Sequence, residues 1–170
     1  MDRRTEMKLA NVNALSGAAF ERAFGEIAEH SPWVARHALV ARPFISRESM
    51  IEAFASAVMK ADHAAQLALL CAHPDLATRA KLTQDSTKEQ AGAGLDTLDA
   101  AEFARFTELN NAYKAKNGFP FIFAVKGATK HQILAGFEMR NHNTQSIELQ
   151  TALQQVCRII RFRLEDKVEA

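Results

Sequence analysis

Cysteine is scarce in this sequence, and both copies lie in apolar surroundings. The 170 residues contain Cys71 within "LALLCAH" and Cys157 within "QQVCRII". A cysteine in such a context usually serves as a small buried hydrophobic residue. We therefore expect both thiols to be buried and the protein to work in a reducing compartment, with the cytoplasm as the favoured location.

An excess of charge and long apolar runs are also missing. Lysine and arginine number 21 against 20 aspartates and glutamates, which gives a formal net charge of +1. This balance provides no basic surface for nucleic acid or for an anionic membrane. No run approaches the ~20 apolar residues that cross a bilayer, and we expect no signal peptide. The sequence therefore predicts neither a nucleic-acid partner nor a membrane partner.

Alternating β-branched runs are almost absent, whereas Ala, Leu, Glu, Gln, Lys and Arg dominate. Residue propensity and the period of the apolar residues both favour helices. The spacing of Phe20, Phe24 and Ile27 predicts one amphipathic helix, and Ser46 is expected to open another. At this length one domain is the simplest organisation, so we predict a single-domain, all-α bundle over residues 1–170.

One apolar segment does not fit a helix. "FPFIFAV" follows Asn117-Gly118, a pair that predicts the end of a helix. The sequence offers this segment no partner strand, and a lone strand leaves its backbone groups unsatisfied. We therefore predict a buried extended connector near residues 119–125.

Motifs for metals and nucleotides are missing too. No cluster of His, Cys or carboxylates accompanies His73 and Asp75 at ligand spacing, and the glycines form no phosphate-binding loop. We expect no metal and no cofactor.

His73-Pro74-Asp75 ends an apolar helical segment, because the residue before a proline is pushed out of helical geometry. A histidine at a helix end is commonly a solvated residue that favours the helix dipole. Histidine can also exchange a proton near neutral pH when a substrate is held beside it. His73 is therefore a candidate acid or base.

Ser86-Thr87-Lys88-Glu89 matches the S-x-x-E capping box, in which both side chains satisfy backbone amides at a helix start. The same helix end could hold a substrate carboxylate or carbonyl, because its free N–H groups carry positive potential. Both interpretations remain open from the residues alone.

The last predicted helix carries Arg163 on its apolar side. Leu149, Leu153, Val156 and Ile160 form a stripe, and Arg163 lies about 60° from Ile160, whereas Arg161 and Arg158 lie about 100° and 160° away. An inward guanidinium needs an anionic or carbonyl partner. That partner is either a substrate or an internal salt bridge.

Four motifs in order resemble the OHCU decarboxylases, and the resemblance spans nearly the whole chain. They are "HPDLA", "STKEQAGAGLD", "NGFPFIFAVKG" and "RIIRFRLEDKV". The resemblance implies conversion of 2-oxo-4-hydroxy-4-carboxy-5-ureidoimidazoline (OHCU) to (S)-allantoin in urate degradation, without a cofactor. One departure is the spacer between the first two motifs, residues 77–85, which is shorter than in many members.

The resemblance also implies roles for individual residues. His73 corresponds to the proton donor, and Glu89 joins it as a catalytic residue. The residues implied to contact substrate are Pro74, Ser86, Thr87, Lys88, Glu89, Gln90, Phe121, Ile122, Phe123, Ala124, Val125 and Arg163. The segment from Phe121 to Val125 is expected to act through its backbone. The sequence does not fix the oligomeric state, and a homodimer is one expectation.

Two other functions compete with the decarboxylase. The protein could be a non-catalytic helical interaction module, in which His73 and Glu89 only cap helices and Arg163 closes a salt bridge. It could also be a hydrolase of the preceding urate-pathway intermediate, with Glu89 activating water. Catalytic residues must converge on one concave pocket, whereas caps need not.

Overall fold

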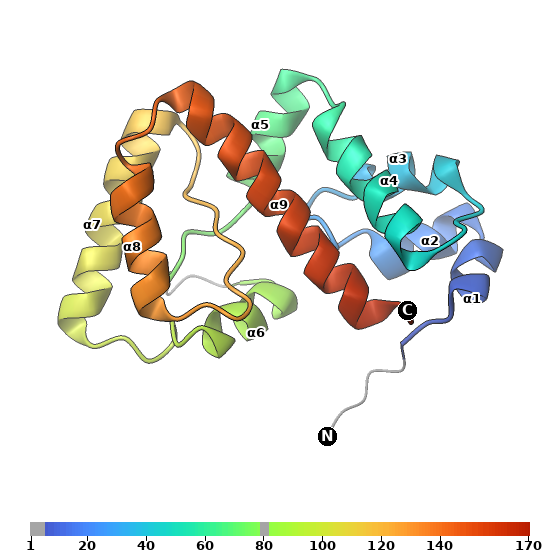
Figure 1. The fold of residues 1–170 in the computed structure, drawn as a ribbon, viewed down its shortest axis with the longest axis horizontal. Coiled ribbons are helices and arrows are strands. Elements are labelled where there is room, and N and C mark those ends of the chain that lie inside the picture. Colours follow the sequence, from blue (N-terminus) through green and yellow to red (C-terminus); the bar gives the residue numbers. More distant parts are fainter. Residues whose placement is uncertain (1–5, 79–81) are drawn as a thin grey trace. The chain divides into compact units, whose positions relative to one another are not determined.

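The computed structural model describes residues 6–78 and 82–170, and in these ranges the regular elements are helices (Figure 1). The β-type pairing found there is one isolated parallel bridge between Met7 and Val168. The predicted all-α class is therefore confirmed. The helices are α1 (Leu9–Ala14), α2 (Gly17–Phe24), α3 (Trp33–Ala38), the 3₁₀ turn η1 (Leu39–Ala41), α4 (Arg47–Met59), α5 (His63–Cys71), α6 (Gln84–Gly92), α7 (Ala100–Asn117), α8 (Lys130–Arg140) and α9 (Gln145–Lys167).

The chain divides into two compact units. Unit 1 consists of Met1–Ala72 together with Cys157–Ala170, and unit 2 is the intervening stretch His73–Val156. Helix α9, red-orange in Figure 1, begins in unit 2 and ends in unit 1. The single domain over residues 1–170 stays a prediction.

Aromatic rings fill the core of unit 1. Phe20 lies 5.0 Å from Phe24 and 6.3 Å from both Phe44 and Phe54, measured between ring centroids. Helix α4 begins after Ser46, as predicted, because the Ser46 hydroxyl accepts a hydrogen bond from the Ser49 amide. Helix α2 ends at Phe24, so the buried Ile27 lies beyond the helix that its spacing predicted.

The two sequence segments of unit 1 are joined at the isolated bridge. The Met7 amide donates to the Lys167 carbonyl at 2.8 Å, and the Glu169 amide donates to the Met7 carbonyl at 3.0 Å. The Arg47 guanidinium adds a hydrogen bond of 3.0 Å to the Val168 carbonyl. The end of α9 is thereby tied to both the first residues of the unit and α4.

In unit 2, helices α7 and α8 lie side by side (Figure 1). An ion pair joins Lys130 to Glu102 at 2.8 Å, and Lys116 Nζ donates a hydrogen bond to the Asn141 carbonyl at 2.6 Å. Helix α7 ends at Asn117, and Gly118 follows with φ of 79°. Left-handed geometry favours glycine, which has no Cβ. The predicted helix end at Asn117-Gly118 is confirmed.

The connector at residues 119–125 forms no helix or strand and is largely buried, so its predicted burial is confirmed. Phe121 stacks on Phe137 of α8 with centroids 3.7 Å apart, and the Tyr113 ring packs edge-on against Phe121 with 5.2 Å between the ring centroids. These contacts bury the side chains of the connector between α7 and α8.

The prediction that both cysteines are buried is wrong for Cys71, which is exposed at the end of α5, while Cys157 is half-buried. The apolar residues around Cys71 in the sequence do not show whether it lies on the buried or the exposed side of the helix. Burial raises the pKa of the Cys157 thiol. Among the described residues, no helix is both long and apolar enough to cross a membrane.

Candidate active site

The His73 turn follows α5 directly. The helix ends at Cys71 with Ala72 as its cap, so His73 lies just outside it, ahead of Pro74 as expected. His73 is 8% exposed, which is too little for the solvated helix-end residue that the simpler interpretation required. Pro74 and Asp75 are half-buried.

Side chains from α7 hold the residues after His73. Lys114 Nζ lies 2.7 Å from an Asp75 carboxylate oxygen, and Asn110 Nδ2 donates to the Leu76 carbonyl at 2.9 Å. Asn110 is 4% exposed, so its bond to the turn is made in the protein interior. An ion pair and a buried hydrogen bond thus fix consecutive residues of the HPDLA motif.

Helix α6 provides a third attachment through Gln90. The Ala77 amide donates to Gln90 Oε1 at 3.0 Å, and both residues are buried. Ala77 has φ of 60°, a strained left-handed value for a residue with a Cβ. The side-chain oxygen of Gln90 therefore satisfies a buried amide that the turn would otherwise leave without a partner.

The predicted capping box at Ser86 is wrong. Helix α6 begins at Gln84, and its cap is Thr83, whose hydroxyl accepts from the Ser86 amide at 3.2 Å. Ser86 is therefore the third helical residue, and Glu89 lies one turn further along. Thr83 and Ser86 are both good caps three residues apart, so the sequence alone could not choose between them.

The residues of the STKEQ segment differ in exposure. Ser86 and Gln90 are buried, and Glu89 is half-buried, whereas Thr87 and Lys88 are exposed. The spacer before the segment, residues 77–85, lies partly outside the described residues, at 79–81. Its effect on the distance between His73 and Glu89 stays a prediction.

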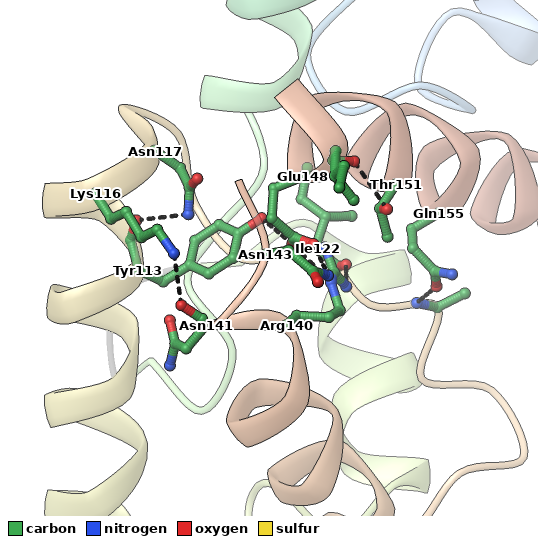
Figure 2. Close-up of polar contacts among 12 residues, drawn as sticks. Tyr113, Lys116, Asn117, Ile122, Arg140, Asn141, Asn143, Glu148, Thr151 and Gln155 are labelled. Carbon is green, nitrogen blue, oxygen red and sulfur yellow. Dashed lines mark hydrogen bonds and ion pairs between the residues drawn. The ribbon is translucent and has the colours of Figure 1, made fainter. Parts of the chain in front are cut away.

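Two side chains hold the backbone of the connector (Figure 2). Arg140 Nη1 donates to the Ile122 carbonyl at 2.7 Å, and the Ala124 amide donates to Gln155 Oε1 at 2.9 Å. The Arg140 guanidinium also lies over the Phe121 ring, 4.2 Å from its centroid. Residues of α8 and α9 thereby fix backbone groups in the segment predicted to contact substrate.

Arg140 belongs to a buried polar cluster with Glu148 and Tyr113. Its Nε donates to Glu148 Oε1 at 2.8 Å, and the Tyr113 hydroxyl donates to the same oxygen at 2.6 Å. Asn143 Nδ2 reaches the other Glu148 oxygen at 2.9 Å. Burial first, and then the hydrogen bond to Glu148, raise the pKa of Tyr113 well above its ordinary value.

The sequence analysis did not name this cluster, although a signal for it exists. Arg140 follows buried Ile133 by seven residues and buried Phe137 by three, which places it on the inner side of α8. Glu148 precedes buried Ala152 by four residues. The argument that found Arg163 on the last helix applies equally to these two positions.

One side of α7 supports both the His73 turn and the connector. Asn110 and Lys114 contact the turn, and Tyr113 contacts Phe121. Side chains three and four residues apart project from the same side of a helix. Unit 2 therefore joins three predicted site segments, namely the His73 turn, α6 through Gln90, and residues 121–125.

Arg163 is the fourth predicted part of the site and belongs to unit 1. Its Nη2 donates to Glu29 Oε1 at 2.8 Å, and its Nη1 donates to the Ile27 carbonyl at 3.1 Å. The side chains of Arg163 and Glu29 are 5% and 1% exposed. Of the arginines on this helix, Arg158 is exposed and Arg161 pairs with Glu48 at 2.6 Å, so the inward direction of Arg163 is confirmed.

Comparison with known proteins identifies the family. A model of the OHCU decarboxylase family matches residues 13–165 of the chain. The chain belongs to the OHCU decarboxylase family. The OHCU decarboxylase of Haloferax volcanii is 43% identical over 162 residues, which cover 95% of this chain and 96% of the relative.

Two further relatives connect the family to urate breakdown. A uric acid degradation bifunctional protein of Bacillus subtilis is 38% identical over 156 residues, which cover 92% of this chain and 32% of that protein. The crystal structure of an (S)-allantoin synthase superposes with a TM-score of 0.77 at 32% identity, over 96% of this chain and 55% of that one. OHCU decarboxylases are carboxy-lyases of urate degradation, and this chain shares their fold.

Within the described ranges, no group of three or more His, Cys, Asp and Glu side chains is arranged to hold a metal ion.

Proposed function

We propose that the protein decarboxylates OHCU to (S)-allantoin, with His73 as the proton donor and without a cofactor. The observation that carries the proposal is the attachment of Asp75, Leu76 and Ala77 to Lys114, Asn110 and Gln90. This arrangement holds the turn after His73 against two helices of the same unit. A fixed turn is what a proton donor needs, because catalysis depends on the position of the group relative to the reacting atom.

The reaction exchanges a carboxylate for a proton. The bond between the ring carbon and the carboxylate breaks, carbon dioxide leaves, and the electron pair moves into the adjacent imine. His73 then delivers a proton to one face of that carbon, which makes the product a single enantiomer. Polar groups that stabilise the developing charge lower the barrier.

The other predicted residues bind and orient the substrate. Glu89 assists the proton transfer as the second catalytic residue, and Gln90 contributes a side-chain amide. Pro74 lines the site, and Ser86, Thr87 and Lys88 lie in the same first turns of α6. The connector from Phe121 to Val125 acts through backbone groups, and Arg163 is proposed to bind the substrate in addition to its contacts with Glu29 and Ile27.

The decisive experiment supplies freshly generated OHCU and follows optical activity. Uncatalysed decay yields racemic allantoin, so an excess of (S)-allantoin with the purified protein supports the proposal. Racemic product at the uncatalysed rate would contradict it and favour a non-catalytic interaction module. If the protein instead consumes the preceding intermediate and releases OHCU, product analysis identifies the hydrolase. The homodimer and the cytoplasmic location stay predictions.

A further inference from the structure

We infer that Arg140 is a positioning residue, which fixes the backbone of the connector so that the neighbouring backbone groups can bind substrate. The inference rests on the proposed function, because it assumes that residues 121–125 contact OHCU. It assigns a role to a residue that touches neither His73 nor Glu89 in the described contacts. The evidence comes entirely from unit 2.

The first step is the geometry of the connector. The Arg140 guanidinium donates a hydrogen bond to the Ile122 carbonyl, and the Ala124 amide, two residues further along, donates one to Gln155 Oε1 (Figure 2). These two bonded groups lie on either side of Phe123 in the sequence. The protein thus holds the backbone of the connector at two points, one before and one after Phe123.

The backbone of Phe123 lies between these two held points. Among the hydrogen bonds of the described residues, none involves the amide or carbonyl of Phe123, although its side chain is only half-exposed. The Phe123 amide is a hydrogen-bond donor and its carbonyl is an acceptor, and both lie on a backbone that is fixed at the neighbouring residues. Such a donor and acceptor suit a ligand that carries amide and carbonyl groups, as a ureidoimidazoline does. The hydrogen bonds at Ile122 and Ala124 are therefore the support, and the backbone amide and carbonyl of Phe123 are the groups that bind the ligand.

The second step is the rigidity of Arg140 itself. Glu148 is fully buried and binds Arg140, Tyr113 and Asn143, so the carboxylate holds the guanidinium in one place. The planar guanidinium donates toward Glu148 from Nε and toward Ile122 from Nη1 at the same time. A lysine has a single ammonium group and cannot reproduce this fork.

The test uses Arg140→Lys with Ile133→Val as the matched control. Ile133 is buried on the same side of α8 and its side chain carries no hydrogen-bonding group, so its truncation lowers stability without removing a hydrogen bond of the connector. Each variant is characterised by its melting temperature, by amide hydrogen exchange of residues 119–125, and by kcat and KM for OHCU.

We expect Arg140→Lys to speed exchange in the connector and to raise KM about tenfold or more, since small displacements of binding groups are costly. Ile133→Val should leave exchange in the connector and KM unchanged. Equal exchange in wild type and Arg140→Lys would overturn the inference, as would faster exchange without a change in KM. If Arg140→Lys fails to fold, Gln155→Met removes the acceptor for Ala124 from a half-buried position and must give the same pattern.

The failure of the inference and the failure of the proposed function appear in different measurements. A wild-type protein that leaves OHCU unchanged contradicts the proposed function, whereas the hydrogen exchange of the connector does not depend on turnover. Addition of (S)-allantoin, with protection of the Phe123 amide from exchange as the readout, then decides whether the Phe123 backbone binds a ligand. Protection in wild type that is lost in Arg140→Lys supports the inference, and equal protection in both overturns it.

Discussion

Arg163 and Glu29 form a buried ion pair between residues 134 positions apart in the sequence, with 2.8 Å between Nη2 and Oε1. The apolar stripe of the last helix predicted an inward arginine and left its partner open. The ion pair supplies that partner within unit 1, and the Ile27 carbonyl supplies a second. Arg163 therefore has a structural role, whatever it contributes to substrate binding.

We predict that Arg163→Ala lowers the free energy of unfolding by about 3–5 kcal/mol, because it removes the guanidinium that pairs with the buried Glu29 carboxylate. Arg161→Ala is the control on the same helix, since its pair with Glu48 is exposed and screened by water. Urea denaturation of both variants measures the difference. Equal, small losses would show that the buried pair contributes little.

We predict that His73→Asn loses about 10²–10⁴-fold in kcat for OHCU, the usual contribution of a positioned general acid. Its far-ultraviolet circular dichroism should match that of wild type. His131 is exposed at the start of α8, so His131→Asn is the matched control and should remain fully active. Near-wild-type turnover by folded His73→Asn would rule out the proposed proton donor.

We predict that Glu89→Gln loses activity because it removes the negative charge, while the cap of α6 stays intact because that cap is Thr83 and not the Ser86-Glu89 pair. Thr83→Ala is the complementary change and should cost about 1 kcal/mol of stability. Thermal melts and OHCU turnover of both variants separate the two roles. Full activity in Glu89→Gln would remove this carboxylate from the chemistry.

Tyr113 should make stability depend on alkaline pH. Its pKa in the folded protein is raised above the ordinary value of 10.0, so its contribution is complete below about pH 10 and falls as the unfolded chain loses the phenolic proton. The slope is at most about 1.4 kcal/mol per pH unit. Urea denaturation of wild type and Tyr113→Phe between about pH 9 and pH 11 measures it.

Absorbance gives an independent check, because Tyr113 is the single tyrosine of the chain. The tyrosinate band should stay absent while the protein is folded above pH 10.0, the ordinary value for tyrosine, and appear on unfolding. A normal titration in the folded protein would show that the hydroxyl is accessible to water and not held by Glu148.

The helices were predictable where a local signal defines them. Ser46 caps α4 through its own side chain, and Gly118 supplies the left-handed geometry that ends α7. Both effects are decided by residues a few positions apart. The start of α6 was not predictable in the same way, because Thr83 and Ser86 satisfy the same local rule and the choice depends on the surrounding packing.

The site was predictable in residue type but not in its contacts. Helical spacing placed Arg163 inside, yet nothing in the sequence near Arg163 points to Glu29 as its partner. The bond between Gln90 and Ala77 likewise depends on a left-handed turn at an alanine, which local propensity argues against. Long-range partners follow from packing, and packing is decided by the whole chain.

The discontinuous make-up of unit 1 has a consequence for biosynthesis. Residues 157–170 provide Arg163 for Glu29 and Val168 for the bridge to Met7, so a nascent chain lacks these partners until residues 163 and 168 have been synthesised. Unit 2, at His73–Val156, is continuous and can acquire its internal contacts earlier. The Glu29 carboxylate and the Met7 backbone therefore reach their final contacts only after all of unit 2 has been synthesised.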